Sequence, residues 1–287
     1  MTKIRPRRSF IFAPGNKPDM FPKAMATGSD IMCIDLEDAI APQHKEQARR
    51  ATIDWFATAN LDDAVECMVR INPPRTPDGM KDVQAILDAS KEPPALMLAK
   101  VKSPAEVVAL DELFDEFKIG TRLQVIIETN EALEAAWDIA RCSARIDAMF
   151  FGGVDMAADL RCAYTWEALL YARSRVVHAA AGAGVDVIDV PFLDLNDMEG
   201  MRREAEAARA LGFCGKGSIH PKQVPLLNEV FSPSEAEIAH ARRIVDAFEQ
   251  GDSGLVVIDG KLIEKPVLRS MYRVLARAEA ESSASTD

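Results

Sequence analysis

Short apolar runs that lead into a polar or charged side chain recur along the chain. Six of them end this way, at Asn16, Asp38, Asn72, Lys100, Glu128 and Asp155, and two later runs contain Asp189 and His220. The runs are continuously aliphatic and β-branched, which is typical of parallel strands covered on both faces. Helical patterns separate them, over residues 17–27, 45–58, 76–90, 103–117, 130–140, 165–181 and 197–211. The pattern predicts eight alternations of strand and helix.

Several helix boundaries carry capping signals. Ser103 precedes a proline and is followed three positions later by Glu106, which predicts an N-cap, a proline at the first helical position and a capping box. Gly182, Gly184 and Gly212 stand where the helical patterns should stop.

Eight such units in fewer than 250 residues favour a (β/α)8 TIM barrel. A doubly wound sheet usually carries a glycine-rich GxGxxG turn after its first strand, and the first run here has none. We therefore expect residues 1–230 to form the barrel and residues 231–280 a C-terminal helical extension. The extension is either a cover for the barrel or a lid that reaches a neighbouring subunit. The composition of residues 281–287 predicts a disordered tail.

Composition narrows the class of protein. The net charge of −11 over 287 residues argues against nucleic acid or a membrane surface as partner. The five cysteines form no CxxC pair, which is typical of a reducing, cytoplasmic setting. No run of 18 apolar residues occurs, and no apolar segment follows the basic residues at the N-terminus as in a secretory signal.

The first apolar run is surrounded by basic side chains in an otherwise acidic protein. They are Arg5, Arg7, Arg8, Lys17 and Lys23. One interpretation is a solvated terminus, and the other is a seat for the phosphates of a ligand.

The polar side chains at the strand ends indicate where chemistry occurs, because the carboxyl ends of all barrel strands converge on one face. Residues expected there are Glu37, Asp38, Arg70, Lys100, Glu128, Asp155 and His220. Glu128 and Asp155 lie one strand–helix unit apart and offer hard oxygen ligands without a histidine pair, which favours Mg²⁺ over zinc. An ion held by two carboxylates keeps positions for water or substrate oxygens. The alternative is that each acid caps the helix that follows it.

Asp35 adds a third acid beside Glu37 and Asp38, and Arg70 lies in the next apolar run. Asp35, Glu37 and Asp38 fall within four positions and would either bind the waters of the metal or form an ordinary solvated turn. Arg70 interrupts an apolar run, and its fork suits a carboxylate or an enolate oxygen. A structural salt bridge to Glu37 is the rival interpretation. The role of His220, structural or catalytic, stays open.

In these motifs the chain resembles the HpcH/HpaI aldolase family, and within it the citrate lyase β-subunit-like branch of acyl-CoA lyases. The matching blocks are RSFIFAPGNKPDMFPKA, DIMCIDLEDAIAPQHK, VRIN, VIIET, MFFGGVDMAADL, GKGSIHPKQ and DGKLIEKP. The resemblance implies a magnesium-dependent barrel that assembles as a homotrimer or hexamer, with Glu128 and Asp155 as the metal ligands. It also implies that Arg70 contacts the substrate, that Arg8 and Lys17 approach the CoA phosphates, and that Ile219 and His220 line the acyl-CoA site.

Two positions depart from the family pattern. The family's carboxylate near the C-terminus, which reaches a neighbouring subunit's site, is commonly aspartate in GKMID, and the corresponding stretch here ends in Glu264. Glu264 is thus implied as the proton donor, with its carboxylate one methylene farther out. Gly217 replaces the aromatic residue of the family's GKWAIHP, which suggests a wider site that accepts a bulkier acyl group.

The resemblance implies a carbon–carbon lyase that cleaves citramalyl-CoA or malyl-CoA to acetyl-CoA and pyruvate or glyoxylate. Arg70, Glu37, Asp38 and Glu264 are the expected catalytic group, with Mg²⁺ as cofactor. One alternative is the β subunit of a citrate lyase, which acts on a citryl-acyl-carrier protein with α and γ partners. The other is a non-catalytic barrel that binds CoA as a sensor.

Overall fold

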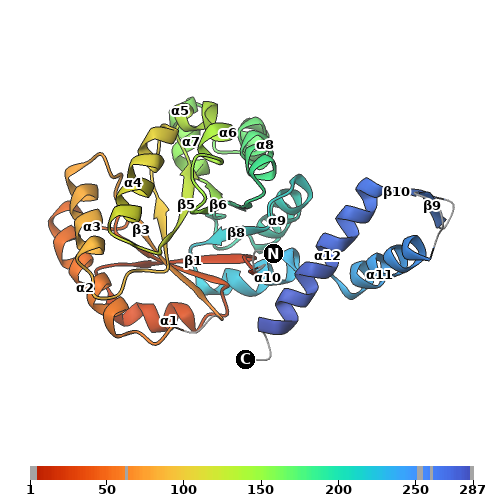
Figure 1. Ribbon diagram of the computed structural model, residues 1–287, viewed down its shortest axis with the longest axis horizontal. Helices are drawn as coiled ribbons and strands as arrows, with labels where there is room; N and C mark the ends of the chain where they lie inside the picture. Colours follow the sequence, from red (N-terminus) through yellow and green to blue (C-terminus); the bar gives the residue numbers. More distant parts are fainter. Residues whose placement is uncertain (1–4, 62–63, 251–254, 259–260, 285–287) are drawn as a thin grey trace. The chain divides into compact units, whose positions relative to one another are not determined.

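The computed structural model describes residues 5–61, 64–250, 255–258 and 261–284. Eight parallel strands in it form a closed barrel in sequence order, and β1 pairs with β8 to complete the circle (Figure 1). The strands are β1 (Ser9–Pro14), β2 (Ile31–Asp35), β3 (Glu66–Ile71), β4 (Ala95–Leu98), β5 (Arg122–Ile127), β6 (Ile146–Phe151), β7 (Asp186–Asp189) and β8 (Gly215–Ser218). The predicted TIM barrel is confirmed.

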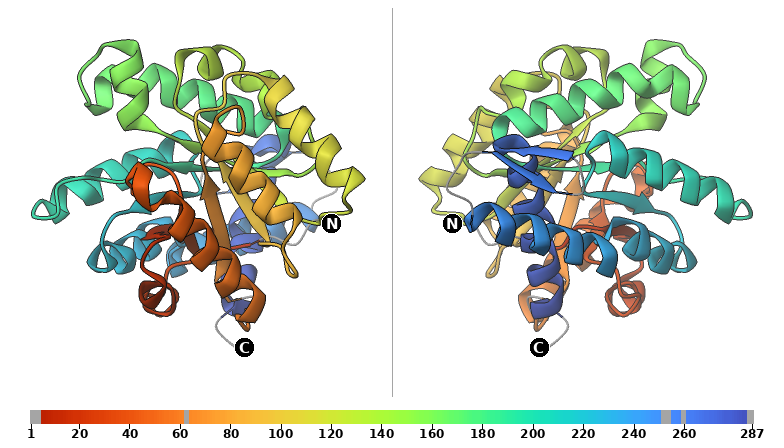
Figure 2. Two further views of the ribbon diagram at one scale, coloured as in Figure 1. Left: turned by 90° about the vertical axis from the view of Figure 1, so that its left-hand side faces the viewer. Right: turned by 90° about the vertical axis from the view of Figure 1, so that its right-hand side faces the viewer.

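Helices surround the strands (Figures 1 and 2). They are α1 (Phe21–Met25), α2 (Lys45–Thr58), α3 (Pro77–Leu87), α4 (Pro104–Glu116), α5 (Asn130–Glu134), α6 (Ala136–Ile139), α7 (Gly153–Leu160), α8 (Trp166–Ala183), α9 (Met198–Leu211) and α10 (Val224–Phe231), with short 3₁₀ turns η1 (Pro18–Met20), η2 (Pro42–His44) and η3 (Pro221–Gln223). The helices expected over residues 17–27 and 130–140 are each broken into two pieces. Asp155 lies in the first turn of α7, not at a strand end.

The predicted N-cap at Ser103 and the proline at the start of α4 are confirmed, whereas the capping box is not. The Ser103 side chain makes no capping bond, and Glu106 accepts hydrogen bonds from the Lys102 N–H at 3.0 Å and from Arg75 at 2.6 Å instead of from the Ser103 N–H. Helix α8 continues through Gly182 and ends at Gly184, whose φ of 75° is left-handed. Gly182 serves packing, because a Cβ there would lie 2.1 Å from the Trp137 ring.

Apolar side chains fill the barrel. The cluster comprises Phe10, Ile31, Cys33, Met68, Ala95, Met97, Ala99, Ile126, Phe150, Ile188 and Cys214. Below it, at the strand starts, Arg7 donates to Glu66 at 2.8 Å, Asp147 at 2.6 Å and Asp186 at 3.1 Å. Arg122 contacts Glu66 and Asp147 as well. Arg7 is therefore a buried residue whose ion pairs connect strands at the amino-terminal end of the barrel, and it does not belong to a solvated basic surface.

The chain divides into two compact units, residues 7–228 and residues 1–6 with 229–287. The second contains α11 (Glu235–Glu249), an antiparallel pair of β9 (Leu255–Ile258) and β10 (Lys261–Glu264), and α12 (Lys265–Ala284), which contacts α11. Residues 281–284 of the expected disordered tail are helical, and residues 285–287 lie outside the described part. In the described ranges, none of the helices has the length and apolar content needed to cross a bilayer.

Candidate active site

Asp35 and Arg70 stand opposite each other at the ends of β2 and β3. The guanidinium group donates from Nε to Oδ1 at 2.7 Å and from Nη2 to Oδ2 at 2.6 Å, and Cζ lies 5.0 Å from the centre of the Phe12 ring. Burial lowers the pKa of Arg70, but the hydrogen bonds and charge of Asp35 outweigh it and raise that pKa above its ordinary value. Asp35 also accepts the N–H groups of Glu37 and Ala39 at 2.9 and 3.0 Å. It thereby fixes the start of the loop after β2 that carries Glu37 and Asp38, hereafter the acidic loop.

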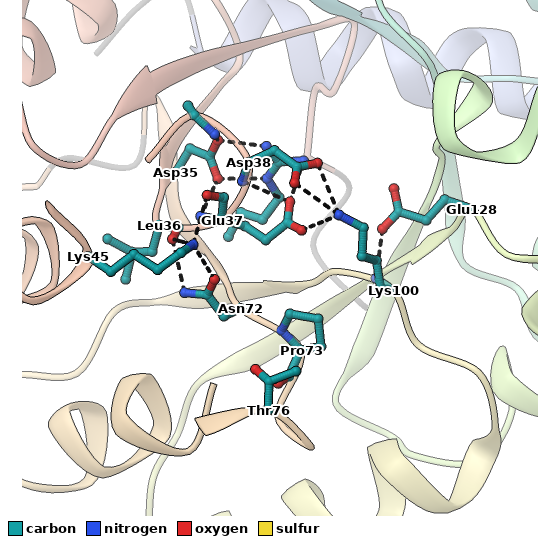
Figure 3. A network of polar contacts seen from close by, with 12 residues as sticks. Asp35, Leu36, Glu37, Asp38, Lys45, Asn72, Pro73, Thr76, Lys100 and Glu128 are labelled. Atoms are coloured by element: carbon teal, nitrogen blue, oxygen red, sulfur yellow. Dashed lines mark hydrogen bonds and ion pairs between the residues drawn. The ribbon is translucent and has the colours of Figure 1, made fainter. Parts of the chain in front are cut away.

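Glu37 and Asp38 share one cation. Lys100 Nζ contacts Glu37 Oε1 and lies 2.9 Å from Asp38 Oδ1 (Figure 3). Arg70 Nη1 is 3.4 Å from Glu37 Oε2. Burial raises the pKa of Glu37, whereas the Lys100 ammonium overcomes the smaller desolvation of Asp38 and lowers the pKa of that carboxyl. The two acids therefore have pKa values shifted in opposite directions.

Glu128 follows β5 and is 3% exposed. Its Oε1 accepts the Lys100 N–H at 2.6 Å (Figure 3). The side chain fits because Gly152 leaves room for it: a Cβ there would lie 2.4 Å from Glu128 Cβ and 2.7 Å from Oε2. Burial raises the pKa of Glu128 to about 7, with a further contribution from the negative charge of Asp155.

Asp155 is partly exposed in the first turn of α7, where the helix dipole favours a negative charge. Its negative charge contributes to the raised pKa of Glu128, so the two predicted metal ligands interact electrostatically. Two hard carboxylates that repel each other fit a divalent cation such as Mg²⁺. The described residues include no group of three or more His, Cys, Asp or Glu side chains arranged around one point. An ion here would complete its shell with water or substrate oxygens.

A second layer of polar contacts holds the acidic loop from below (Figure 3). Lys45 Nζ donates to the carbonyl oxygens of Leu36 and Glu37, both at 3.0 Å, and to Asn72 Oδ1 at 2.5 Å. Asn72 Nδ2 donates to Leu36 O at 2.9 Å and to Asp82 at 2.6 Å. The sequence assigned no role to these residues. Asn72 could have been found from its position, because it is a polar residue at the end of an apolar run. No sequence pattern marked Lys45 as part of the site.

Arg8 is not brought to this end of the barrel. It precedes β1, and its main-chain N–H and Nε both donate to Asp30, which precedes β2. Because β1 and β2 are parallel, both residues lie at the end opposite to Glu37. Lys17 follows β1 and is exposed on the side of the acids.

Ile219 and His220 follow β8, the neighbour of β1, and both are exposed. The His220 ring has a structural role here, since its Nδ1 accepts the Lys222 N–H at 3.1 Å. Gln223 completes this capping box by accepting the N–H groups of Ile219 and His220. The box fixes the loop that presents Ile219.

One expectation is corrected here, and one further acid of the apolar runs lies apart from the site. Gly217 opens no space, because a Cβ there would lie 2.7 Å from Pro191 and 3.1 Å from Phe150, which already fill it. Asp189 does not join the acids. It pairs with Lys216 at 2.6 Å and with Arg173 of α8 at 2.9 Å, fully buried between strands and helices.

Glu264, the last residue of β10, is exposed in the C-terminal unit. Its part in the site stays a prediction.

Similarity to known proteins agrees with this arrangement. Residues 8–221 match the family model described as HpcH/HpaI aldolase/citrate lyase, and residues 165–280 match a carbon–carbon bond lyase of the TIM-barrel fold. Citrate lyase subunit beta of Leuconostoc mesenteroides subsp. cremoris is 32% identical over 98% of this chain and 96% of its own length. The L-malyl-CoA/beta-methylmalyl-CoA lyase of Rhodobacter capsulatus is 34% identical, over 96% of this chain and 95% of its own length.

Among solved structures, CitE of Mycobacterium tuberculosis in complex with magnesium, acetoacetate and coenzyme A aligns with a TM-score of 0.79 and 29% identity, over 94% of this chain and 97% of that one. The family match runs from the start of the barrel to the loop after β8, and so includes the strand ends that carry the acids. The chain is therefore a carbon–carbon lyase and belongs to the HpcH/HpaI aldolase/citrate lyase family.

Proposed function

We propose that the chain is a magnesium-dependent acyl-CoA lyase that cleaves citramalyl-CoA or malyl-CoA to acetyl-CoA and pyruvate or glyoxylate. The observation that carries the proposal is the buried Glu128 carboxylate, which lies near Asp155 and on the same end of the barrel as the Arg70 guanidinium. Relatives that act on malyl-CoA, and a related structure that contains magnesium, acetoacetate and coenzyme A, support it.

Glu128 and Asp155 would hold the ion. When bound, Mg²⁺ supplies a Lewis acid for the hydroxyl and carboxylate oxygens that become the 2-oxo acid. Cleavage transfers the hydroxyl proton to a base, forms the new carbonyl, and moves the electron pair of the carbon–carbon bond onto the thioester as an enolate. Arg70 would stabilise the negative charge on the enolate oxygen. Electrostatic stabilisation of charge that develops in the transition state is usually the largest single contribution to catalysis.

The acids would divide the proton transfers. Glu37, whose pKa burial raises, is suited to accept the hydroxyl proton, while Asp38 stays ionised beside Lys100. Glu264 from a neighbouring subunit would protonate the enolate carbon and release acetyl-CoA. This role requires a homo-oligomer, for which we propose a trimer or hexamer. Lys17, Ile219 and His220 would contact the CoA moiety, whereas the position of Arg8 favours a structural role in the barrel.

The direct test is cleavage by the purified chain of citramalyl-CoA and of malyl-CoA, with Mg²⁺ and with EDTA. Release of acetyl-CoA with pyruvate or glyoxylate only in the presence of Mg²⁺ would support the proposal and rank the substrates. Binding of CoA without turnover of either thioester would leave a sensor as the better interpretation.

A second candidate is the β subunit of a citrate lyase, favoured by the 32% identity to such a subunit over nearly the whole chain. It predicts cleavage of a citryl-acyl-carrier protein to oxaloacetate and an acetylated carrier, together with co-purification of α and γ subunits. Activity of the isolated chain on a CoA thioester, with none on the carrier-bound one, would count against it.

A further inference from the structure

Lys100 has a backbone conformation that side-chain-bearing residues seldom adopt. Its φ of 53° lies in the left-handed region, in the loop after β4. Left-handed residues other than glycine persist where the surrounding structure holds them, and they gather at functional sites. Lys118, with a φ of 58° at the end of α4, is a second left-handed lysine, and it is exposed and outside the site.

The left-handed turn gives Lys100 two separate contacts with the acids (Figure 3). Its main-chain N–H points at Glu128 Oε1, 2.6 Å away. Its side chain runs to the other acids, where Nζ contacts Glu37 and lies 2.9 Å from Asp38 Oδ1. One residue thus joins the carboxylate proposed as a metal ligand to the two carboxylates proposed for proton transfer.

We propose that Lys100 is a positioning residue, whose left-handed backbone orients Glu128 for the metal while its ammonium orients Glu37 and Asp38. The inference rests on the proposed Mg²⁺ site at Glu128 and Asp155. A hydrogen bond to one oxygen of a ligating carboxylate fixes the direction of the other oxygen, and losing such a support typically weakens metal binding by about 10- to 100-fold. A free side chain at Glu128 would have to be ordered by the ion itself.

The backbone contribution can be isolated by two substitutions that remove the same amine. Lys100→Gly adopts φ near 53° without strain, so the N–H stays on Glu128. Lys100→Val opposes that conformation, because a β-branched residue at positive φ is strongly disfavoured. We expect Mg²⁺ binding, measured by isothermal titration calorimetry on the full chain, to be about 10- to 100-fold weaker for Lys100→Val than for Lys100→Gly. The Mg²⁺ affinity of Lys100→Ala should lie between those of the glycine and valine variants. Lys100→Ala replaces Lys100→Val in the comparison if the valine variant does not fold.

Lys118 provides the matched control. Lys118→Gly and Lys118→Val impose the same backbone contrast, and both should bind Mg²⁺ like the wild-type chain. Equal Mg²⁺ affinities for the glycine and valine variants at position 100 would overturn the positioning role of the backbone. Failure of the metal site itself would look different, since the wild-type chain and Glu128→Gln would then show the same Mg²⁺ titration.

The side-chain contribution has a separate readout. At saturating Mg²⁺, Lys100→Gly should lower kcat for acyl-CoA cleavage and leave KM near that of the wild-type chain, because the amine touches the proton-transfer acids. Lys100→Arg, which keeps a cation near Glu37 and Asp38, should recover part of kcat. A kcat for Lys100→Gly equal to that of the wild-type chain would overturn the side-chain role.

Discussion

Arg70 binds Asp35 through Nε and Nη2 at 2.7 and 2.6 Å, and its Nη1 is left 3.4 Å from Glu37 Oε2. The two interpretations of this arginine are therefore compatible. Two nitrogens form a structural bridge between neighbouring strands, and the remaining nitrogen faces the acids of the site. The bridge fixes the plane of the guanidinium group, so the donors of Nη1 have a defined direction.

Arg70→Lys tests whether this fork is needed. Lysine keeps the charge but cannot hold Asp35 at two points and donate toward the site as well. We expect kcat/KM to fall by about 100- to 1,000-fold, the usual loss when one donor to a developing oxyanion is removed. Steady-state kinetics with citramalyl-CoA and malyl-CoA measure it. A rate like that of the wild-type chain would restrict Arg70 to a structural role.

Glu128→Gln removes one proposed metal ligand with little change of shape. We expect the loss of Mg²⁺ binding and of Mg²⁺-dependent cleavage in a chain that still folds, judged by calorimetry, product release and circular dichroism. Glu131, an exposed acid three residues further along the chain, provides the control, and Glu131→Gln should behave like the wild-type chain. Retained activity in Glu128→Gln would argue against the metal site.

The raised pKa of Glu128 predicts a pH dependence of stability in the metal-free chain. Its pKa is about 7 in the folded state against 4.5 for an ordinary glutamate, so between these values the folded state binds more protons than the unfolded state. The contribution of Glu128 to the free energy of unfolding should therefore decrease as the pH rises from 4.5 to about 7, by at most about 1.4 kcal/mol per pH unit, and then level off.

Urea unfolding in EDTA over this pH range, for the wild-type chain and for Glu128→Gln, isolates the effect as a difference between the two. Added Mg²⁺ should reduce it, because the ion offsets the buried charge. Parallel pH profiles of the two chains would contradict the assignment.

Gly152→Ala tests the fit of Glu128 against β6. The new Cβ would lie 2.4 Å from Glu128 Cβ, so the carboxylate must move. We expect weaker Mg²⁺ binding and a lower rate. Gly120→Ala, where the nearest atom is at an ordinary 3.7 Å, is the matched control and should leave both unchanged. Unaltered Mg²⁺ affinity in Gly152→Ala would show that the site tolerates displacement of this side chain.

A site shared between subunits predicts complementation. Glu128→Gln and Glu264→Gln should each be inactive alone, and mixed oligomers formed by refolding them together should regain activity, because some sites then combine an intact Glu128 with an intact Glu264. Size-exclusion chromatography with light scattering would confirm mixed assemblies. Mixed oligomers without activity would place both groups in one subunit's site, and an active Glu264→Gln variant on its own would remove Glu264 from the site.

The barrel and the position of Glu128 at the end of β5 were predictable from the sequence, because continuous apolar runs and their polar ends are local patterns. The end of an apolar run does not by itself show which way its polar residue points: Asp189 ends such a run as the site acids do, but it pairs with Lys216 away from them. Gly217 was misread for a similar reason: the space beside it is filled by Pro191 and Phe150, from other parts of the chain. The left-handed turn at Lys100 had no local signal, since lysine rarely adopts it.

The ion pairs at the amino-terminal end of the barrel stabilise the fold, whereas the acids proposed for catalysis lie at the opposite end. Arg7 fastens the starts of three strands around one guanidinium group, at the end of the barrel away from the acids. Substitutions in the loops above need not disturb that fastening, so the reacting end can diverge while the scaffold persists. Exchange of loop residues can therefore change the substrates of such a barrel while the amino-terminal ends of its strands stay the same.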